Sequence, residues 1–164
     1  EEEGGFKAIT NIENEIKKLN FPEKNILQNY LANFYWQYYT NNQYTINQRS
    51  NTSNFDNPDF RLWSSNDFIL KITNLFDHSL QNTAQLYNIN IGNYNDLINQ
   101  GNTEGRIRKP TLYHVLANDV LNFYTNENTY LTQPSYQFTI NEKIYFSDVA
   151  SFISIKINSK DSHI

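Results

Sequence analysis

The sequence predicts a mainly α-helical protein, an irregular multi-helix domain with long ordered loops. Apolar residues recur at the three- and four-residue spacing of a helix in four separate windows. Helix-start signals, either capping boxes or prolines, stand at or near the beginning of these windows. The chain has 164 residues, of which 38% are apolar and 15% aromatic. A chain of this length and content buries a core without disulfides or metals.

The first window predicts a helix from Phe6 that ends before Pro22, because proline disfavours helical geometry in the residue before it. A capping-box match over 10–13 offers Thr10 as an alternative start. The apolar face consists of Phe6, Ile9, Ile12, Ile16 and Leu19.

The second window predicts a helix over about 23–40, with Pro22 in its first turn. Its apolar stripe consists of Ile26, Leu27, Tyr30, Leu31, Phe34 and Tyr38. Trp36 and Tyr39 project to the far side of that stripe, and Tyr35 lies at its edge. A helix that is apolar nearly all round is buried on more than one side. We therefore expect this helix to lie between layers, with Tyr35, Trp36 and Tyr39 as a candidate interaction surface.

Residues 41–65 read as a long loop pinned to the helices by scattered apolar residues, which are Tyr44, Ile46, Phe55, Phe60, Leu62 and Trp63. A sequon at 51–53 is expected by chance, since about one position in six is Asn. A capping-box match over 64–67 then predicts a third helix. Its apolar stripe consists of Phe68, Ile69, Ile72, Leu75, Phe76 and Leu80.

The stretch 81–110 reads as irregular, with a helical turn near 95–99 and a turn bracketed by Gly101 and Gly105. Pro110 opens a fourth helix, whose apolar face consists of Leu112, Val115, Leu116, Val120, Phe123 and Tyr124.

Beyond residue 126, alternation over 136–140 is typical of a strand. A short helix near 145–153 followed by extended chain completes the prediction. The pairing of helices would be tetratricopeptide-like and antiparallel, although no 34-residue repeat is present.

The chain reads as part of a longer protein, because it contains no Met and begins Glu-Glu-Glu-Gly-Gly. Residues 1–5 are interpreted as a linker or an artificial chain terminus, and residues 6–164 as a single helical domain. Within it, 141–164 is expected to depend on downstream chain. No apolar run is long enough to span a membrane, and no signal peptide is evident.

Composition excludes several classes of function. The absence of Cys excludes disulfides, thiolate–metal sites and Cys nucleophiles. A net charge of −4 argues against nucleic acid, because phosphate neutralisation needs clustered cations. His78, His114 and His163 lack metal-ligand spacing, and Asp77-His78-Ser79 cannot converge on a helix as a triad. We therefore expect no enzyme activity, no metal and no cofactor.

Asp119 is the one charge on an apolar helix face. It is either a functional acid with a raised pKa or, as we favour, a carboxylate held by a Tyr hydroxyl or an Arg. Arg106, Arg108 and Lys109 form the one basic cluster, just before a predicted helix start, where cations oppose the helix dipole. They are a candidate anion contact, with pairing to Asp56, Asp59 or Asp67 favoured. A partial calcium-loop pattern over 56–59 lacks the required Gly and Glu.

Three blocks resemble one protein family. They are Leu31-Ala32-Asn33-Phe34-Tyr35-Trp36-Gln37-Tyr38-Tyr39 with Asn41-Asn42, then Gly101-Asn102-Thr103-Glu104-Gly105 through Arg108-Lys109-Pro110-Thr111-Leu112-Tyr113 to Leu116-Ala117, and finally Thr129–Phe138. In this order they resemble the N-terminal region of Bacteroidetes alpha-2-macroglobulin-like proteins, ahead of the macroglobulin β-sandwich domains.

The resemblance implies a helical N-terminal module of a large endopeptidase inhibitor of the cell envelope, either secreted or a lipoprotein, that traps proteases. The chain has no thioester motif and no recognisable bait, so neither capture step is expected here. The expected function is a non-catalytic scaffold or interaction module. Its partners would be neighbouring domains of the same polypeptide and, through the parent protein, target proteases, with no contact to nucleic acid or membrane. The alternative is a glycan- or peptide-binding module that uses exposed Tyr, Trp and Asn.

Overall fold

The computed structural model describes residues 2–49, 57, 59–94, 98, 103–126, 140 and 142–157. The described chain is mainly helical, as predicted. It divides into two compact units, 1–125 and 126–164, where the sequence predicted one domain over 6–164. The elements of the first unit are α1 (Glu2–Ile16), α2 (Glu23–Asn47), η1 (Phe60–Leu62), α3 (Ser65–Ser79), α4 (Thr83–Tyr87), η2 (Ile91–Tyr94), α5 (Thr103–Arg108) and α6 (Leu112–Tyr124). The second unit contains η4 (Lys143–Phe146) and α7 (Val149–Ile153). None of the described helices is long and apolar enough to cross a membrane.

Helix α1 begins at Glu2, so the residues expected as a linker form its first turn. The alternative start at Thr10 is wrong, because the Thr10 hydroxyl donates to the backbone oxygen of Phe6 inside the helix (2.9 Å). Ile9 and Ile16 of the predicted apolar face are buried. The helix ends at Ile16, earlier than the predicted end at Phe21-Pro22, so Leu19 of the predicted apolar face lies outside it.

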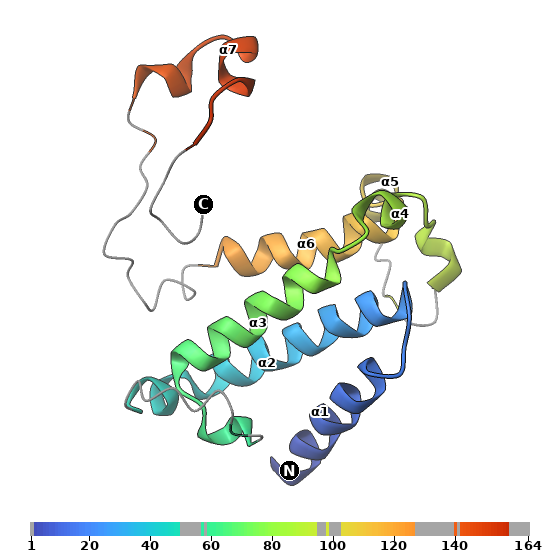
Figure 1. Ribbon diagram of the computed structural model, residues 1–164, viewed down its shortest axis with the longest axis vertical. Coiled ribbons are helices and arrows are strands. Elements are labelled where there is room, and N and C mark those ends of the chain that lie inside the picture. Colours follow the sequence, from blue (N-terminus) through green and yellow to red (C-terminus); the bar gives the residue numbers. More distant parts are fainter. Residues whose placement is uncertain are drawn as a thin grey trace. The chain divides into compact units, whose positions relative to one another are not determined.

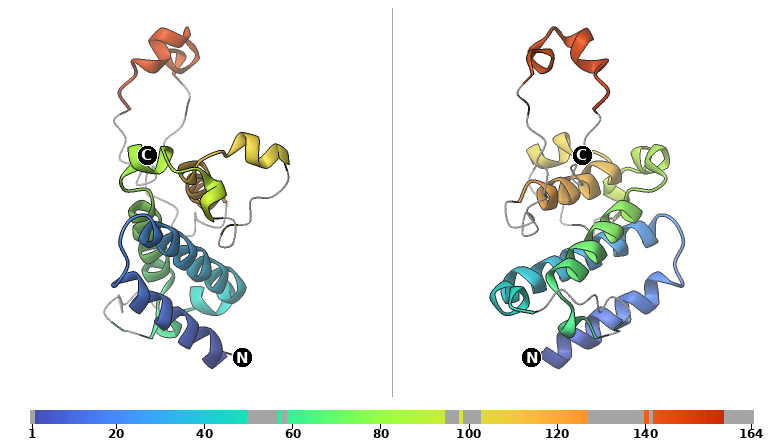
Figure 2. Two further views of the ribbon diagram at one scale, coloured as in Figure 1. Left: turned by 90° about the vertical axis from the view of Figure 1, so that its right-hand side faces the viewer. Right: turned by 60° about the vertical axis from the view of Figure 1, so that its left-hand side comes forward.

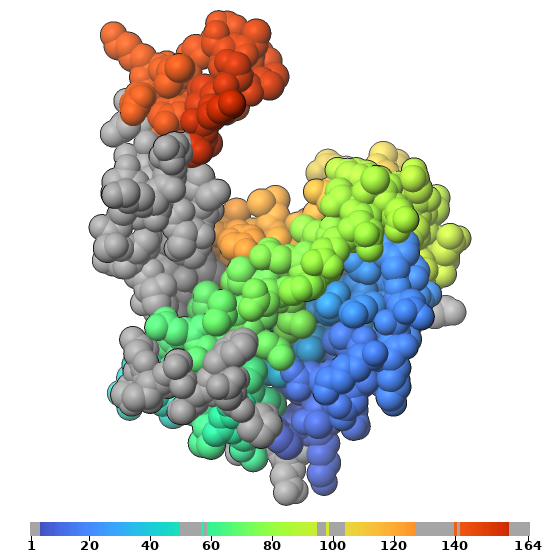
Figure 3. All heavy atoms as spheres, viewed as in Figure 1, coloured from blue at the N-terminus to red at the C-terminus, as the bar shows by residue number. Residues whose placement is uncertain are grey.

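Helix α2 is the centre of the first unit and contacts α1, α3 and α6 (Figures 1 and 2). It continues to Asn47, seven residues past the predicted end at 40, because Ile46 is buried one heptad beyond Tyr39. In Figure 3, α1 and α3 lie over much of α2 on the face shown. The expectation that α2 is packed on more than one side is confirmed.

Helices α2 and α3 run antiparallel. Asn25, near the start of α2, donates to the backbone oxygen of Ser79 at the end of α3 (3.0 Å). At the other end of the pair, the Ser65 hydroxyl donates to Oδ1 of Asn47 (2.7 Å). The predicted capping box that starts α3 is confirmed, with Ser64 and Asp67 bonding each other's backbone N–H groups.

The main core is an aromatic cluster between α1, α2, α3 and η1. Phe60 and Trp63, two of the predicted loop anchors, are buried in it. Phe55 and the sequon lie outside the described residues, while Tyr44 and Leu62 are exposed. The rings of Tyr35 and Trp63 stack with centroids 5.4 Å apart. Edge-to-face and stacked ring pairs of this kind stabilise the fold beyond the contribution of the apolar area that they bury.

A second, smaller core joins the start of α2 to α4 and α6. It consists of Ile26, Leu86, Ile98, Leu112 and Leu116. The predicted apolar face of α6 is confirmed, since Leu112, Leu116, Val120 and Phe123 are buried. The expected turn at Gly105 is wrong, because Gly105 lies within α5, and the turn near 95–99 is described only at Ile98.

The described part of the C-terminal unit contains two short helical segments. The predicted short helix near 145–153 is present as η4 and α7, and Asp148 caps α7 by accepting from the backbone N–H groups of Ala150 and Ser151 (3.1 Å each). The extended segment predicted over 136–140 lies outside the described residues except for Ile140.

Candidate functional site

Three asparagines on α2 form a polar seam in an otherwise apolar surface, and we use this name for Asn25, Asn29 and Asn33. The spacing of four residues places them on one face of the helix. The Asn25 amide donates to the backbone oxygens of Ser79 and Gln81 (3.0 Å each). Since the last carbonyls of a helix lack partners within it, Asn25 caps α3 from the neighbouring helix.

The same seam ties α2 to α6. The Asn29 amide donates to the backbone oxygen of Leu116 (3.2 Å). Asn33 donates to Oδ1 of Asn29 (3.2 Å) and to Oδ2 of Asp119 (3.3 Å). Buried polar groups are costly without partners, so these bonds fix how α3 and α6 sit on α2. The sequence signal for this seam is the repeat of Asn at every fourth position of α2, which the apolar periodicity does not register.

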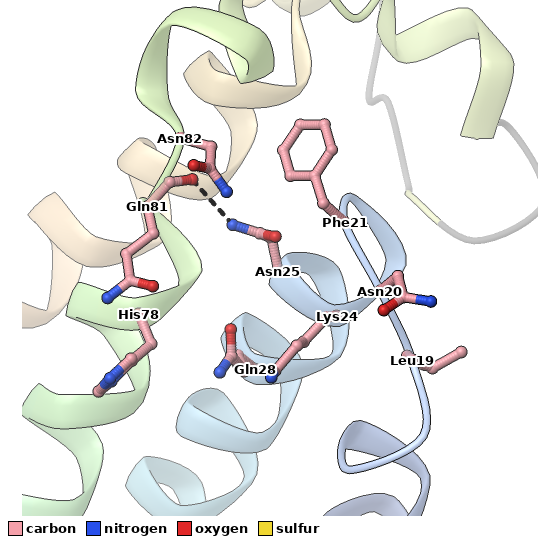
Figure 4. A pocket seen from close by; sticks show the side chains of 9 residues that line it. All are labelled: Leu19, Asn20, Phe21, Lys24, Asn25, Gln28, His78, Gln81 and Asn82. Atoms are coloured by element: carbon pink, nitrogen blue, oxygen red, sulfur yellow. Dashed lines mark hydrogen bonds between the residues drawn. The ribbon is translucent and has the colours of Figure 1, made fainter.

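A polar pocket of about 280 Å³ opens beside the first asparagine of the seam, between the α1–α2 connection and the α3–α4 turn (Figure 4). We call it the amide pocket because five of its lining side chains are carboxamides. The hydrogen bond from Asn25 to Gln81 joins α2 to the turn at this place. Its lining residues are Leu19, Asn20, Phe21, Lys24, Asn25, Gln28, His78, Gln81 and Asn82.

Gln28 stands out among these amides. Only 9% of the residue is exposed, yet its side chain makes no hydrogen bond to any described residue. Among the described residues, every side-chain nitrogen or oxygen that is closed to solvent has a hydrogen-bond partner. Because the Gln28 amide has none, it must be open to solvent. The solvent that reaches it is that of the amide pocket, which Gln28 lines.

A second cavity, of about 210 Å³, lies between α2 and α6 and contains Asp119. Desolvation by burial raises the pKa of the Asp119 carboxyl, while hydrogen bonds from Asn33 and Asn118 and the charge of Lys109 act to lower it. Asp119 is half-buried, and its carboxylate accepts a hydrogen bond, which is the general part of the favoured prediction. Its donor is an amide of the polar seam, Asn33, where the sequence favoured a Tyr or an Arg.

Replacing Asp119 tests this environment. Because the pKa of the folded state is raised, the carboxyl supports the fold most at low pH, and its contribution declines as the pH rises through the folded pKa. We expect Asp119→Asn to be more stable than the wild type at pH 7 and to lose that advantage near pH 3. Urea unfolding at both pH values measures the difference, with the exposed Glu104→Gln as control. Equal free energies of unfolding for wild type and variant at both pH values would contradict the assignment.

The predicted interaction surface of Tyr35, Trp36 and Tyr39 is wrong. Tyr35 is 1% exposed and Tyr39 is fully buried, and the Trp36 ring packs edge-on against Phe123 of α6 at 5.1 Å. The far face of α2 is covered by helices of this same chain. The sequence showed that two faces are apolar, but apolarity does not identify what covers them.

Tyr35 has a polar partner in the core. Its hydroxyl donates to Oε1 of Glu13 (3.1 Å), which also accepts from Nζ of Lys71 (2.8 Å). Glu13 therefore links α1, α2 and α3 through one carboxylate. Burial, followed by the charge of Glu13, raises the pKa of the Tyr35 phenol well above its ordinary value.

The basic cluster has a different setting from the predicted one. Arg106 and Arg108 lie in the last turn of α5, where the helix dipole favours cations. The reason for expecting an anion beside them is thereby removed, although an anion contact of Arg106, Arg108 and Lys109 stays a prediction. The two described acids favoured as partners have other contacts: Asp59 bonds Arg61 (2.7 Å), and Asp67 closes the α3 capping box. Asp56 lies outside the described residues.

The histidines lie in separate settings. His78 lines the amide pocket, and its Nδ1 bonds the backbone oxygen of Asn74. His114 bonds the Thr111 hydroxyl (2.7 Å), and His163 lies outside the described residues. In the Asp77-His78-Ser79 run, the Ser79 hydroxyl donates to the backbone oxygen of Phe76 (2.7 Å). Among described residues, no three His, Asp or Glu side chains are grouped to hold a metal ion.

An apolar groove of about 230 Å³ runs between α1 and α2. Phe34, predicted to lie in the buried stripe of α2, borders it with 47% of its surface exposed. A Cβ added to Gly5, which also lines the groove, meets no atom within 4 Å. The remaining lining residues are Ala8, Ile9, Ile12, Gln37, Tyr38 and Asn41.

Comparisons of the chain with protein families, with curated proteins and with solved structures find no match.

Proposed function

We propose that this chain is a non-catalytic helical scaffold and interaction module. In this proposal it is the N-terminal module of a large alpha-2-macroglobulin-like protease inhibitor of the bacterial cell envelope. Its direct partners are neighbouring domains of the same polypeptide, and target proteases are reached through the parent protein. The tetratricopeptide-like pairing belongs to the same proposal, and the antiparallel α2–α3 pair supports it.

The apolar surface of the C-terminal unit carries the proposal. Neither η4 nor α7 buries a single residue. Phe146 is 75% exposed and Ile153 is 76% exposed, and the large apolar side chains of Ile144, Val149 and Phe152 are exposed as well. Soluble domains rarely leave apolar groups of this density in water, and such surfaces typically mark contacts with other proteins. A neighbouring domain that covers η4 and α7 is the partner that this chemistry favours.

The apolar groove between α1 and α2 supplies a second surface of the same chemistry. The resemblance contributes the identity of the partner, since the family places this region next to macroglobulin domains. The first resembling block runs along α2, where Leu31, Ala32, Tyr35 and Tyr39 are buried. Similarity at buried positions relates to packing, so it supports a shared scaffold more than a shared reactive site.

Photo-crosslinking tests the proposal. A benzophenone amino acid is placed at Phe152 in cells that produce the chain naturally, and the crosslinked product is identified by mass spectrometry. We expect links to macroglobulin-type β-sandwich sequence. The matched control is Tyr44, an isolated aromatic residue on α2 that is 81% exposed. No link from position 152, or equal yields from both positions, would contradict a specific contact through α7.

Polar substitution in the same surface gives a prediction for the purified chain. Phe146→Ser combined with Phe152→Ser is expected to reduce self-association and binding of an apolar dye. The free energy of unfolding should change by less than about 0.5 kcal/mol, because neither side chain is buried. Light scattering, dye fluorescence and urea unfolding measure the three quantities. A large loss of stability with unchanged association would show that these residues hold the unit together instead of serving a partner.

The groove is tested by Gly5→Leu, which fills it, against Gly4→Leu. An added Cβ meets open space at both glycines, and Gly4 does not line the groove. We expect only Gly5→Leu to weaken association with the neighbouring domain in a co-purification assay.

A further inference from the structure

We propose that the amide pocket binds a carbohydrate that carries a carboxylate, a hexuronate residue. This inference rests on Gln28 and its surroundings and is independent of the macroglobulin proposal. The sequence analysis offered a glycan-binding alternative that relied on exposed Tyr, Trp and Asn. The present inference keeps the asparagines and places binding in the amide pocket, since Tyr35 and Tyr39 are buried.

Gln28 is the observation that points to a ligand. A side chain nine-tenths buried has its amide aimed at the pocket without a partner among the described residues. A carboxamide carries two N–H donors and one acceptor oxygen, and in Gln28 these are open to the solvent of the pocket, so a ligand that enters must replace hydrogen bonds to water. A ligand hydroxyl, which donates and accepts at once, satisfies both halves of the amide.

The other amides extend this complementarity. Asn20, Gln81 and Asn82 come from two connections on opposite sides of the pocket (Figure 4). Asn25 is held in place by its bonds to Ser79 and Gln81, so it fixes the wall and does not need the ligand. Several amides around one hollow suit a ring with hydroxyls on adjacent carbons. Phe21 adds an apolar surface for the C–H face of such a ring.

The charges in the pocket select an anionic sugar. The titratable lining residues are Lys24 and His78, and none of the lining residues is acidic. His78 bonds the Asn74 backbone oxygen through Nδ1, which leaves Nε2 for a ligand. A Lys ammonium attracts a carboxylate as a compact charge with three donors. The pocket volume of about 280 Å³ is close to the lower end of ordinary ligand sites and admits one sugar ring.

Binding is measured by side-chain amide NMR on the full chain, with methyl glucuronide as the probe. Methyl glucoside and acetate are the matched probes that separate the ring from the carboxylate. We expect glucuronide to shift the Gln28 amide signals, with glucoside weaker and acetate without effect on Gln28. Equal binding of acetate and glucuronide would show carboxylate attraction only and would overturn recognition of a sugar.

Two variants assign the binding to this pocket. Gln28→Leu is expected to weaken glucuronide binding by about tenfold, the effect of losing hydrogen bonds worth 1.4 kcal/mol. Its free energy of unfolding should be unchanged or higher, because a poorly paired amide is replaced by an apolar group. Lys24→Gln is expected to remove the preference for glucuronide over glucoside.

The controls are Gln37→Leu on the same helix, outside the pocket, and Lys7→Gln on α1. Both are expected to bind like the wild type. Unchanged affinity in Gln28→Leu, or no signal shift with any probe at tens of millimolar, would overturn the proposal.

Discussion

Phe68→Ala is expected to lower the free energy of unfolding by about 3–5 kcal/mol, the usual cost of truncating a buried Phe. The Phe68 side chain is fully buried at the start of α3. Its ring lies 5.4 Å from that of Trp63 and 5.7 Å from that of Tyr39, measured between centroids. Removing it leaves a cavity between α2, α3 and the η1 segment. Since whole domains are stable by about 5–15 kcal/mol, this loss is a large share of the total.

Two further substitutions make the measurement specific. Phe68→Leu keeps most of the volume and should cost about 1.5 kcal/mol or less. Leu70→Ala, on the exposed side of the same helix, should change stability by no more than about 0.5 kcal/mol. Urea unfolding followed by tryptophan fluorescence reports directly on the packing around Phe68, because Trp63 is in ring contact with it. Similar losses for Phe68→Ala and Leu70→Ala would contradict the assigned core.

Asn25→Ala is expected to destabilise the first unit by about 1–3 kcal/mol, the cost of leaving buried acceptors without partners. Asn25 is 4% exposed, and its amide is the donor to the last turn of α3. Loss of this cap should loosen the α3–α4 turn before the rest of the unit, because Gln81 loses its bond at the same time. Hydrogen exchange of the backbone amides over 77–86 measures that local opening, and urea unfolding measures the total.

Asn41→Ala is the matched control on the same helix. Asn41 is exposed, and Ala is the better helix former, so a small gain in stability is expected. The two Asn→Ala substitutions in α2 should therefore act in opposite directions. A loss at Asn41 as large as that at Asn25 would mean that the polar seam has no special part in packing α3 against α2.

Sequence patterns alone predicted the elements whose signals are local. The capping box at Ser64, the stripe that follows it and the apolar face of α6 all have the expected positions, because capping bonds and helical spacing act within a few residues. The end of α2 was missed, since polar Asn and Gln residues over 41–48 hide a helix that Ile46 anchors from its buried face. Burial against another helix overrides local propensity at such positions.

The sequence by itself determined a helical protein without cysteine and with many aromatic residues, and it singled out Asp119 as the charge on an apolar helix face. Only the tertiary structure decided which face of α2 meets this chain's own helices, and thereby removed Tyr35, Trp36 and Tyr39 as a free surface. It also gave Asn25, Asn29 and Asn33 a structural role, since this polar seam bonds α3 and α6. The amide pocket likewise arises from residues 19–28 and 78–82 together. The physical reason is the same in each case: helical periodicity records that a side chain is apolar or polar, whereas its partner is chosen by chain segments distant in sequence.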